Sequence, residues 1–352
     1  MPQSVEVRRV VAAAATAAQP YVRNVAGRLL RSEAFAHGLN RLEERAGGLV
    51  IYPRRDLRVS DLAAFLFHTT ALRDEFSWTC HVADAAFVVP VDPDFPRPSP
   101  SNDPWGPASY WHRPDNRKIR DFYERYLTRR PSGVFLDIGA NWGMHLYPFA
   151  AAGYRCVGFE PQTACCEFIE RVRALNRFTN LDIVQSAVGA GACEAVPFFE
   201  SDIAAFSSMN QEHVAAFNQP WRQLTIGCVT LDAYCEQRQL SPTLIKIDTE
   251  GFEWEVLRGA MTILQALKPT ILVEVSSPLE QQHAMWEALA GLGYRCYAVD
   301  RSMRARYPAQ PFTLVHHVAE FTRRGLEGAD TGSYESDADF VFLQPQDDVL
   351  ST

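Results

Sequence analysis

Two acidic residues close neighbouring apolar segments of the sequence, and a turn containing glycines follows the first. Asp137 comes just before Gly139 and Gly143, and Glu160 follows the apolar run Arg155–Phe159. Glycines in such a turn let the backbone approach a ligand and accept positive φ angles. An acid after the second strand of a doubly wound fold accepts hydrogen bonds from two ribose hydroxyls. The alternative for Glu160 is a carboxylate that caps the next helix.

The positions of the glycines in the turn distinguish a dinucleotide cofactor from an amino-acid-containing one. The dinucleotide fingerprint GxGxxG would need glycines at positions 139, 141 and 144, but Asn141 and Met144 occupy the last two. A turn that lacks this pyrophosphate cradle and follows an acid fits a zwitterionic amino-acid cofactor, so we predict an S-adenosylmethionine site. Its candidate binding residues lie at the ends of successive strands: Asp137, Gly139, Asn141, Gly143, Glu160, Pro161, Ser186 and Asp248.

A second acidic group is expected at the same edge of the sheet. Asp248 and Glu250 follow the apolar run Leu244–Ile247, and Glu274 ends the next strand. Methyl transfer to an alcohol requires removal of a proton, so Asp248 is the first candidate base and Glu250 the second. Two alternatives stay open: Glu250 as an acid favoured by a helix dipole, and all three carboxylates as ligands of Mg²⁺. Glu253 is expected on a solvated helix face.

Other side chains are candidates for roles around the reaction centre. His145 begins the helix behind the glycine turn and is a candidate general base, although a lone histidine is more often structural. Ser207, Ser208 and Glu274 are candidate substrate-binding residues, the two serines in a segment that either covers the acceptor or is a plain surface loop. A buried Lys246 would need a carboxylate partner, so we expect it to support the acidic site.

The elements that must position these residues alternate from residue 133 onward. Apolar runs separated by amphipathic segments are typical of a mostly parallel sheet with helices on both faces. We predict an α/β fold: a doubly wound, seven-stranded, Rossmann-like methyltransferase sheet, with a hairpin, a polar loop and a small helix inserted at 195–229. The strands are expected at Val134–Ile138, Arg155–Phe159, Leu181–Gln185, Leu244–Ile247, Thr270–Val275, Tyr294–Val299 and Phe340–Leu343.

The chain before this domain has a different pattern. Residues 1–117 are predicted to be a mainly helical region with a proline-rich linker, and residues 118–352 the cofactor-binding domain. The linker leads into a short amphipathic helix at Ile119–Leu127. The first residues favour an alanine-rich helix over a signal peptide. The N-terminal region is a candidate homodimer contact, a cover for the acceptor site or a docking site for another protein.

Composition narrows the functional classes. A net charge of −8 argues against general binding to nucleic acid or anionic membranes. The sequence has no run of the ~18 apolar residues that a spanning helix needs. The eight cysteines include no CxxC pair, and those in apolar runs are expected to be buried free thiols. We therefore predict a cytoplasmic protein.

The chain from about residue 133 to 275 resembles the FkbM family of methyltransferases. The matching segments are Asp137-Ile-Gly-Ala-Asn141-Trp-Gly143, Gly158-Phe-Glu160-Pro161, Ser207-Ser208-Met209, Thr230-Leu-Asp232, Ile245-Lys-Ile-Asp248-Thr-Glu250-Gly251-Phe-Glu253, Leu257-Arg-Gly259-Ala and Leu272-Val-Glu274. The resemblance implies S-adenosylmethionine-dependent O-methylation of a sugar, glycan or secondary metabolite, and so a small-molecule or glycan acceptor. His145 stands where the family usually has a small hydroxylated residue, which leaves its role open.

Two rival functions can be weighed on the same residues. The alternative to an enzyme is a catalytically inactive cofactor-binding or scaffold protein, and the presence of Asp137, Gly139, Glu160 and Asp248 argues against it. Nucleic-acid methylation would need a basic face and an Asn/Asp-Pro-Pro-aromatic motif after the fourth strand. The sequence has Asp248-Thr-Glu-Gly at that place, so we expect no nucleic-acid substrate.

Overall fold

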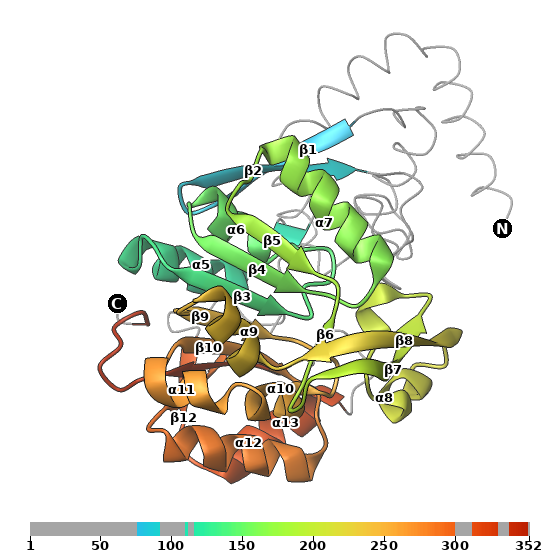
Figure 1. Ribbon diagram of the computed structural model, residues 1–352. Helices are drawn as coiled ribbons and strands as arrows, with labels where there is room; N and C mark the ends of the chain where they lie inside the picture. The colour runs from blue at the N-terminus through green and yellow to red at the C-terminus, as the bar shows by residue number, and fades with distance from the viewer. Residues whose placement is uncertain (1–75, 92–109, 112–115, 300–311, 330–337, 351–352) are drawn as a thin grey trace, which may run out of the picture. The chain divides into compact units, whose positions relative to one another are not determined.

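The computed structural model describes residues 76–91, 110–111, 116–299, 312–329 and 338–350 (Figure 1). The chain divides into two units, Met1–Cys80 with Val88–Asn116, and His81–Phe87 with Arg117–Thr352. The predicted N-terminal helices and most of the linker lie outside the described residues. Within residues 1–117, the described strands β1 (Phe76–Val82) and β2 (Ala85–Val91) form a two-stranded sheet, which the predicted helical pattern did not indicate. The domain boundary at residue 117 stays a prediction.

The larger sheet has eight strands in the order β12-β11-β13-β10-β9-β3-β4-β5. Strands β10, β9, β3, β4 and β5 are parallel, and β13 runs antiparallel between β10 and β11. This confirms the doubly wound fold and the seven predicted strands, each within two residues. The strands are β3 (Val134–Ile138), β4 (Arg155–Phe159), β5 (Leu181–Val184), β9 (Leu244–Ile247), β10 (Thr270–Val275), β11 (Arg295–Val299), β12 (Phe312–Val315) and β13 (Ala338–Leu343).

Helices cover both faces of this sheet (Figure 1). One face carries the main apolar core, formed by strand residues such as Leu136 and Val157 with five helices: α9 (Leu231–Arg238), α10 (Glu253–Arg258), α11 (Met261–Leu267), α12 (Leu279–Gly291) and α13 (Val318–Ala329). On the other face the Phe135 ring lies 4.3 Å from that of Phe149 in α6 (Leu146–Ala151) and 6.4 Å from that of Tyr123 in α5 (Arg117–Arg129), between centroids. The predicted helix Ile119–Leu127 is confirmed as α5. A further helix, α7 (Thr163–Asn176), packs against β5.

A second, three-stranded sheet is inserted between β5 and α9. Its strands β6 (Ala187–Val188), β7 (Cys193–Ser201) and β8 (Trp221–Val229) lie in the order β6-β8-β7. A 3-10 turn, η2 (Ala204–Phe206), and a short helix, α8 (Gln211–Ala216), connect β7 to β8. This confirms the predicted hairpin with a loop and a small helix. All eight cysteines are free thiols and only Cys193 is exposed, which also agrees with prediction.

The strand order places the candidate residues at a topological switch point. The chain proceeds from β3 toward β4 and β5 on one side, and from β9 to β10 on the other, so the order reverses between β3 and β9. Open α/β sheets bind ligands in the crevice outside the carboxyl ends of the strands at this point. Asp137 lies near the carboxyl end of β3, Glu160 follows β4 and Asp248 follows β9.

Gly139→Ala is expected to destabilise the fold at this point. Gly139 has a φ of +77°, and a Cβ atom there would lie 1.8 Å from the carbonyl oxygen of Asp248. Because the obstacle is backbone, β3 and β9 must separate, and we expect a loss of ~3 kcal/mol or more in the free energy of unfolding. Urea denaturation measures it. Gly191→Ala is the control, since a Cβ there meets nothing within 4 Å; equal stability of the two variants would contradict the prediction.

Candidate active site

Glu160 organises the glycine turn after β3. Asn141 has a left-handed φ of 48°, and its backbone N–H donates to Glu160 Oε2 (2.8 Å). The N–H of Gln162 donates to Glu160 Oε1 (2.9 Å), directly before α7. Glu160 thus orders both the turn and the approach to the next helix. Each carboxylate oxygen has two lone pairs, so one on each oxygen is left for a ligand.

Asp137 brings a second buried carboxylate to the same place. Its side chain has no exposed surface, and neither oxygen has a hydrogen-bond partner in the described part of the chain. Lys246 Nζ lies 3.6 Å from Asp137 Oδ1. Burial raises the pKa of Asp137, an effect that Lys246 opposes and Asp248 reinforces. Burial likewise raises the pKa of Glu160 to about 7, although the two backbone N–H groups lower it. Acceptor atoms without partners fit a ligand that brings donors and positive charge.

Lys246 links the acids of β3 and β9. Its Nζ donates to Asp248 Oδ2 at 2.9 Å, and the lysine side chain is only 4% exposed. Asp248 keeps 24% of its side-chain surface exposed, so a substrate can reach it. The expected pairing of Lys246 with a neighbouring carboxylate is confirmed. Three carboxylates, Asp137, Glu160 and Asp248, share this edge with one lysine, which favours a cationic ligand.

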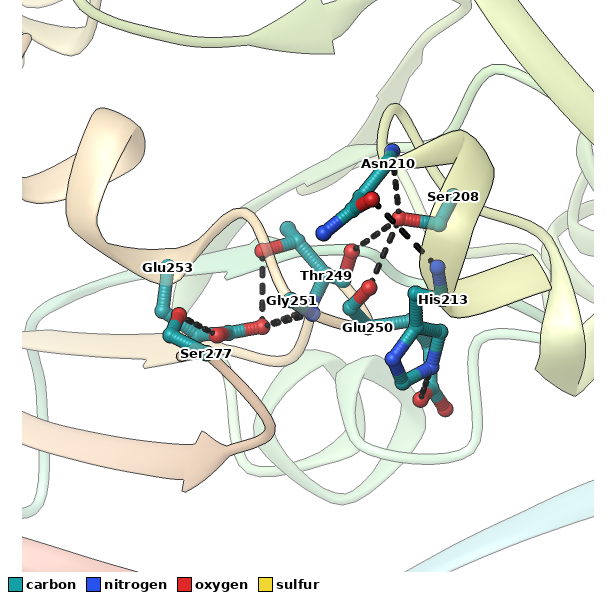
Figure 2. Close-up of polar contacts among 8 residues, drawn as sticks. All are labelled: Ser208, Asn210, His213, Thr249, Glu250, Gly251, Glu253 and Ser277. Carbon is teal, nitrogen blue, oxygen red and sulfur yellow. Dashed lines mark hydrogen bonds and ion pairs between the residues drawn. The ribbon is translucent and has the colours of Figure 1, made fainter. Parts of the chain in front are cut away.

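Glu253 is the residue whose position was predicted wrongly. It has no exposed surface, and its Oε1 accepts hydrogen bonds from Thr249 N (3.3 Å), Thr249 Oγ1 (3.1 Å) and Gly251 N (2.8 Å) (Figure 2). Its Oε2 accepts from Ser277 Oγ. Glu253 turns back at the start of α10 and sets the shape of the turn that carries Asp248 and Glu250. The expectation of a solvated helix face failed because the turn, rather than water, supplies its donors.

Glu253→Gln is expected to destabilise the protein by about 1.5–3 kcal/mol. The amide cannot accept at both ends, so one group of buried donors would face an NH₂ group. Chemical denaturation measures the change, and the affinity for S-adenosylmethionine should fall with it if the turn loses its shape. Glu255→Gln is the matched control, because Glu255 pairs with Arg258 at the surface and should change stability by less than ~1 kcal/mol. A Glu253→Gln protein as stable as this control would refute the role.

Glu250 does not join Asp248 and Glu274 in a metal site. Its Oε2 lies 2.9 Å from His213 Nε2 of α8 (Figure 2). Val273 pairs with Ile247, which places Glu274 beside Asp248 along the edge, while β13 pairs Glu274 with Asp339. Across the residues that the structure describes, no group of three or more His, Cys, Asp or Glu side chains is arranged to hold a metal. The candidate ligands Asp248, Glu250 and Glu274 are therefore not gathered into one group among the described residues, and Mg²⁺ binding stays a prediction.

The two serines of the inserted segment form hydrogen bonds within the protein. Ser207 Oγ accepts from the N–H of Ser201 (3.0 Å). Ser208 Oγ donates to the carbonyl oxygen of Glu250 (2.7 Å) and accepts from Asn210 N (2.9 Å). Ser208 therefore fastens the segment beside the turn after β9, whereas Ser207 stabilises the segment internally. Their direct contact with a substrate stays a prediction.

Two other candidates lie among structural contacts. His145 is buried behind the glycine turn, and its Nδ1 lies 2.7 Å from the Tyr123 hydroxyl. This contact favours the structural interpretation, and a catalytic role for His145 stays a prediction. Ser186 Oγ lies 2.9 Å from the carbonyl oxygens of both Ala187 and Gly227, so its hydroxyl proton is used within the protein. Its place in the cofactor site is likewise only predicted.

His213 is a site residue that could not be found from sequence patterns. It lies 37 positions before Glu250, in the short helix α8 of the inserted segment, outside the alternating pattern of the main sheet. Glu253 was detectable in principle. It belongs to the series Asp248-Thr-Glu250-Gly251-Phe-Glu253, and an acid at the start of a helix often binds the free N–H groups there.

Residues 137–296 match the Methyltransferase FkbM domain. The chain is similar to the structure of a methyltransferase FkbM from Methylobacillus flagellatus KT, with 15% identity and a TM-score of 0.37, over 65% of this chain and 54% of that one. It is also similar to the structure of a SAM-dependent methyltransferase from Agrobacterium tumefaciens, with 10% identity and a TM-score of 0.35, over 77% of this chain and 70% of that one. A third similar structure is M. jannaschii TYW2 in complex with AdoMet, with 11% identity and a TM-score of 0.34, over 77% of this chain and 88% of that one.

The match to the first of these structures spans about half of that protein's length. No curated protein matches the chain. No helix among the described residues is long and apolar enough to cross a membrane. The family match begins at Asp137 and takes in Glu160 and the turn after β9. The chain therefore carries a methyltransferase domain of the FkbM family over residues 137–296.

Proposed function

We propose that the protein is an S-adenosylmethionine-dependent O-methyltransferase acting on a hydroxyl of a sugar, glycan or secondary metabolite. The observation that carries the proposal is the pair of buried carboxylates, Asp137 and Glu160, at neighbouring strand ends of the switch point. Glu160 keeps acceptor capacity on both oxygens, as a ribose diol requires. Asp137 has two acceptor atoms without a hydrogen-bond partner, which suits a ligand bearing an ammonium or sulfonium charge.

Different residues of this chain would bind the cofactor and remove the proton of the acceptor. S-adenosylmethionine supplies a methyl group on a positively charged sulfur. Glu160 binds the ribose hydroxyls, and the glycine turn lets the backbone come close. Asp248 orients the acceptor hydroxyl and takes its proton, because its side chain is partly exposed at the end of β9. Lys246 holds Asp248 in place through the 2.9 Å hydrogen bond.

The chemistry of the groups at this edge supports a hydroxyl acceptor. An alcohol must lose its proton when it takes the methyl group, and Asp248 with Glu250 offers carboxylates near the site of transfer. The family match supports methyl transfer, and the chemistry of these side chains supports oxygen as the nucleophile. The net charge of −8 speaks against a polyanionic nucleic-acid substrate.

The proposal is tested by incubating the full chain with S-adenosylmethionine carrying an isotope-labelled methyl group. The acceptors are nucleotide sugars, glycolipids and free glycosides, and mass spectrometry follows the label. Label on an oxygen of one class of acceptor is the expected result. If the chain binds the cofactor and labels no hydroxyl compound, the O-methyltransferase assignment fails and an inactive cofactor-binding protein takes its place.

A further inference from the structure

The inserted segment contacts the turn after β9 at Glu250 and at the Thr249 carbonyl, which lies 3.4 Å from Ser208 Oγ. Ser208 Oγ donates to the Glu250 carbonyl (2.7 Å), and His213 Nε2 lies 2.9 Å from Glu250 Oε2 (Figure 2). Asn210 orients the histidine, because its Oδ1 accepts hydrogen bonds from the N–H groups of Glu212 (3.0 Å) and His213 (3.3 Å) at the start of α8. The insertion therefore delivers an imidazole to the carboxylate two residues beyond Asp248.

Glu250 adopts a backbone conformation that its residue type disfavours. Its φ is +54°, in the left-handed region that side chains with a Cβ avoid. Such a conformation persists only where the surroundings hold it, and it is concentrated at functional sites. A glycine at position 250 would form the same turn without strain, so the turn alone does not require a glutamate. The distinctive property of residue 250 is the carboxylate that meets His213.

The pair of side chains has the chemistry of a hydroxyl-binding site. A hydroxyl both donates and accepts hydrogen bonds, and a carboxylate beside an imidazole offers an acceptor and a ring nitrogen together. The side chains of His213 and Glu250 are 17% and 25% exposed, so the pair lies near the surface and within reach of a ligand. The Phe217 ring lies 5.1 Å from that of His213, and Phe206 stacks on Phe217 at 4.0 Å, which adds an apolar wall. Sugars combine hydroxyl edges with apolar faces in this way.

We propose that His213 is an acceptor-positioning residue, which together with Glu250 binds a second hydroxyl of a polyhydroxylated acceptor beside the one that Asp248 deprotonates. This inference rests on the proposed function and adds to it a class of acceptor and a residue from the insertion. The pair sets which hydroxyl faces the methyl group, because a second anchoring point fixes the orientation of the ring.

The test uses the full chain saturated with S-adenosylhomocysteine and three probes, the methyl pyranosides of glucose, galactose and mannose. Saturation-transfer NMR and titration measure their binding. His213→Leu is expected to weaken glycoside binding about 10–100-fold, the value of one charge-assisted hydrogen bond, and to leave the affinity for S-adenosylhomocysteine unchanged. His213→Gln keeps a donor toward Glu250 and should recover part of the loss. His283→Leu, at an exposed histidine of α12, is the matched control.

The outcomes separate this inference from the proposed function. With a labelled methyl donor, His213→Leu should raise KM for the glycoside more than it lowers kcat. Glu250→Gln should have a similar effect, and the double variant should lose little more than either single one, because the pair acts as a unit. If no probe binds the unmutated chain, the sugar acceptor and this inference fail together. If a probe is bound and methylated but His213→Leu leaves its affinity and KM unchanged, only this inference is overturned. A parallel loss of melting temperature and S-adenosylhomocysteine affinity would likewise overturn it, because it would show a purely structural role.

Discussion

Asp248→Asn is expected to lower the rate of methyl transfer by a factor of about 10²–10⁴, the usual effect of losing a general base. Asparagine keeps the size of the side chain, and its Oδ1 can still accept the hydrogen bond from Lys246 that Asp248 accepts at 2.9 Å. The variant loses only the charge and the ability to take a proton. Its affinity for S-adenosylmethionine should therefore stay close to that of the unmutated chain. Single-turnover kinetics with a labelled methyl donor separates the two quantities.

Two comparisons make this result specific. Asp182→Asn is the matched control, because Asp182 is 40% exposed and pairs with Arg155 at the surface; it should leave the rate unchanged. Treatment with EDTA should have no effect on the unmutated enzyme if Asp248 acts as a direct base. Activity lost to EDTA and restored by Mg²⁺ would make Asp248 a metal ligand. If Asp248→Asn methylates at the normal rate, Asp248 is neither the general base nor a metal ligand.

Glu160→Ala is expected to weaken the binding of S-adenosylmethionine about 10²–10⁴-fold. The estimate takes two hydrogen bonds from the ribose to a charged acceptor, each worth about 1.5–3 kcal/mol. Calorimetric titration measures the affinity, and circular dichroism checks that the turn after β3 is still folded. Glu167→Ala, at an exposed glutamate of α7, is the control. If Glu160→Ala binds S-adenosylmethionine with unchanged affinity, Glu160 does not bind the ribose.

The titration of Glu160 gives the same assignment a pH dependence. Burial raises its pKa from the ordinary 4.5 to about 7 in the free protein. The folded state therefore holds this proton more tightly than the unfolded chain. The corresponding stabilisation, about 3 kcal/mol, is complete below pH 4.5 and is lost as the pH rises through about 7. Glu160→Gln stays neutral, so its stability relative to the unmutated chain should increase between about pH 5 and pH 8.

Ligand affinity should follow the opposite trend. Above pH 7 the unmutated carboxylate is ionised and accepts both ribose hydroxyls, whereas below it the acid resembles the glutamine variant. The advantage of the unmutated chain over Glu160→Gln in S-adenosylmethionine affinity should therefore be largest near pH 8 and shrink as the pH falls below about 7. Comparing the two proteins cancels the ionisation of the cofactor itself. An advantage independent of pH would show that Glu160 is not the titrating group.

The sequence predicted those strands and helices whose hydropathy pattern along the chain matches their burial in the folded protein. The strands β3, β4 and β9 are short apolar runs because helices cover both of their faces, and such runs are legible from hydropathy alone. β12 was missed because it is a four-residue edge strand with Thr313 exposed, so it carries little pattern. The interval from Trp254 to Leu264 has one helical pattern but forms two helices. A Cβ at Gly259 would lie 2.0 Å from the Gly189 carbonyl, so the loop before β7 packs against the point where the helix breaks.

The residues of the candidate site were likewise predictable only where the order of strands along the chain determines their position. Asp137, Glu160 and Asp248 were found because each acid stands at a strand end, and parallel strands bring their carboxyl ends to one edge. The burial of Glu253 and the pairing of Glu250 with His213 depend on how a turn and an insertion close in space. Neither partner set is encoded in the spacing along the chain. The expected grouping of Glu250 with Asp248 and Glu274 was not found for this reason, since the Glu250 carboxylate lies against His213.

A crystal structure of the full chain with S-adenosylhomocysteine would show whether Glu160 binds the ribose of the cofactor. We expect both ribose hydroxyls to lie within hydrogen-bond distance of the Glu160 carboxylate, about 2.5–3.0 Å between oxygens. We also expect the sulfur to face the edge formed by Asp137 and Asp248, with the open side toward Glu250 and His213. A ligand bound elsewhere, or one whose ribose makes no contact with Glu160, would contradict the proposed cofactor site and the function built on it.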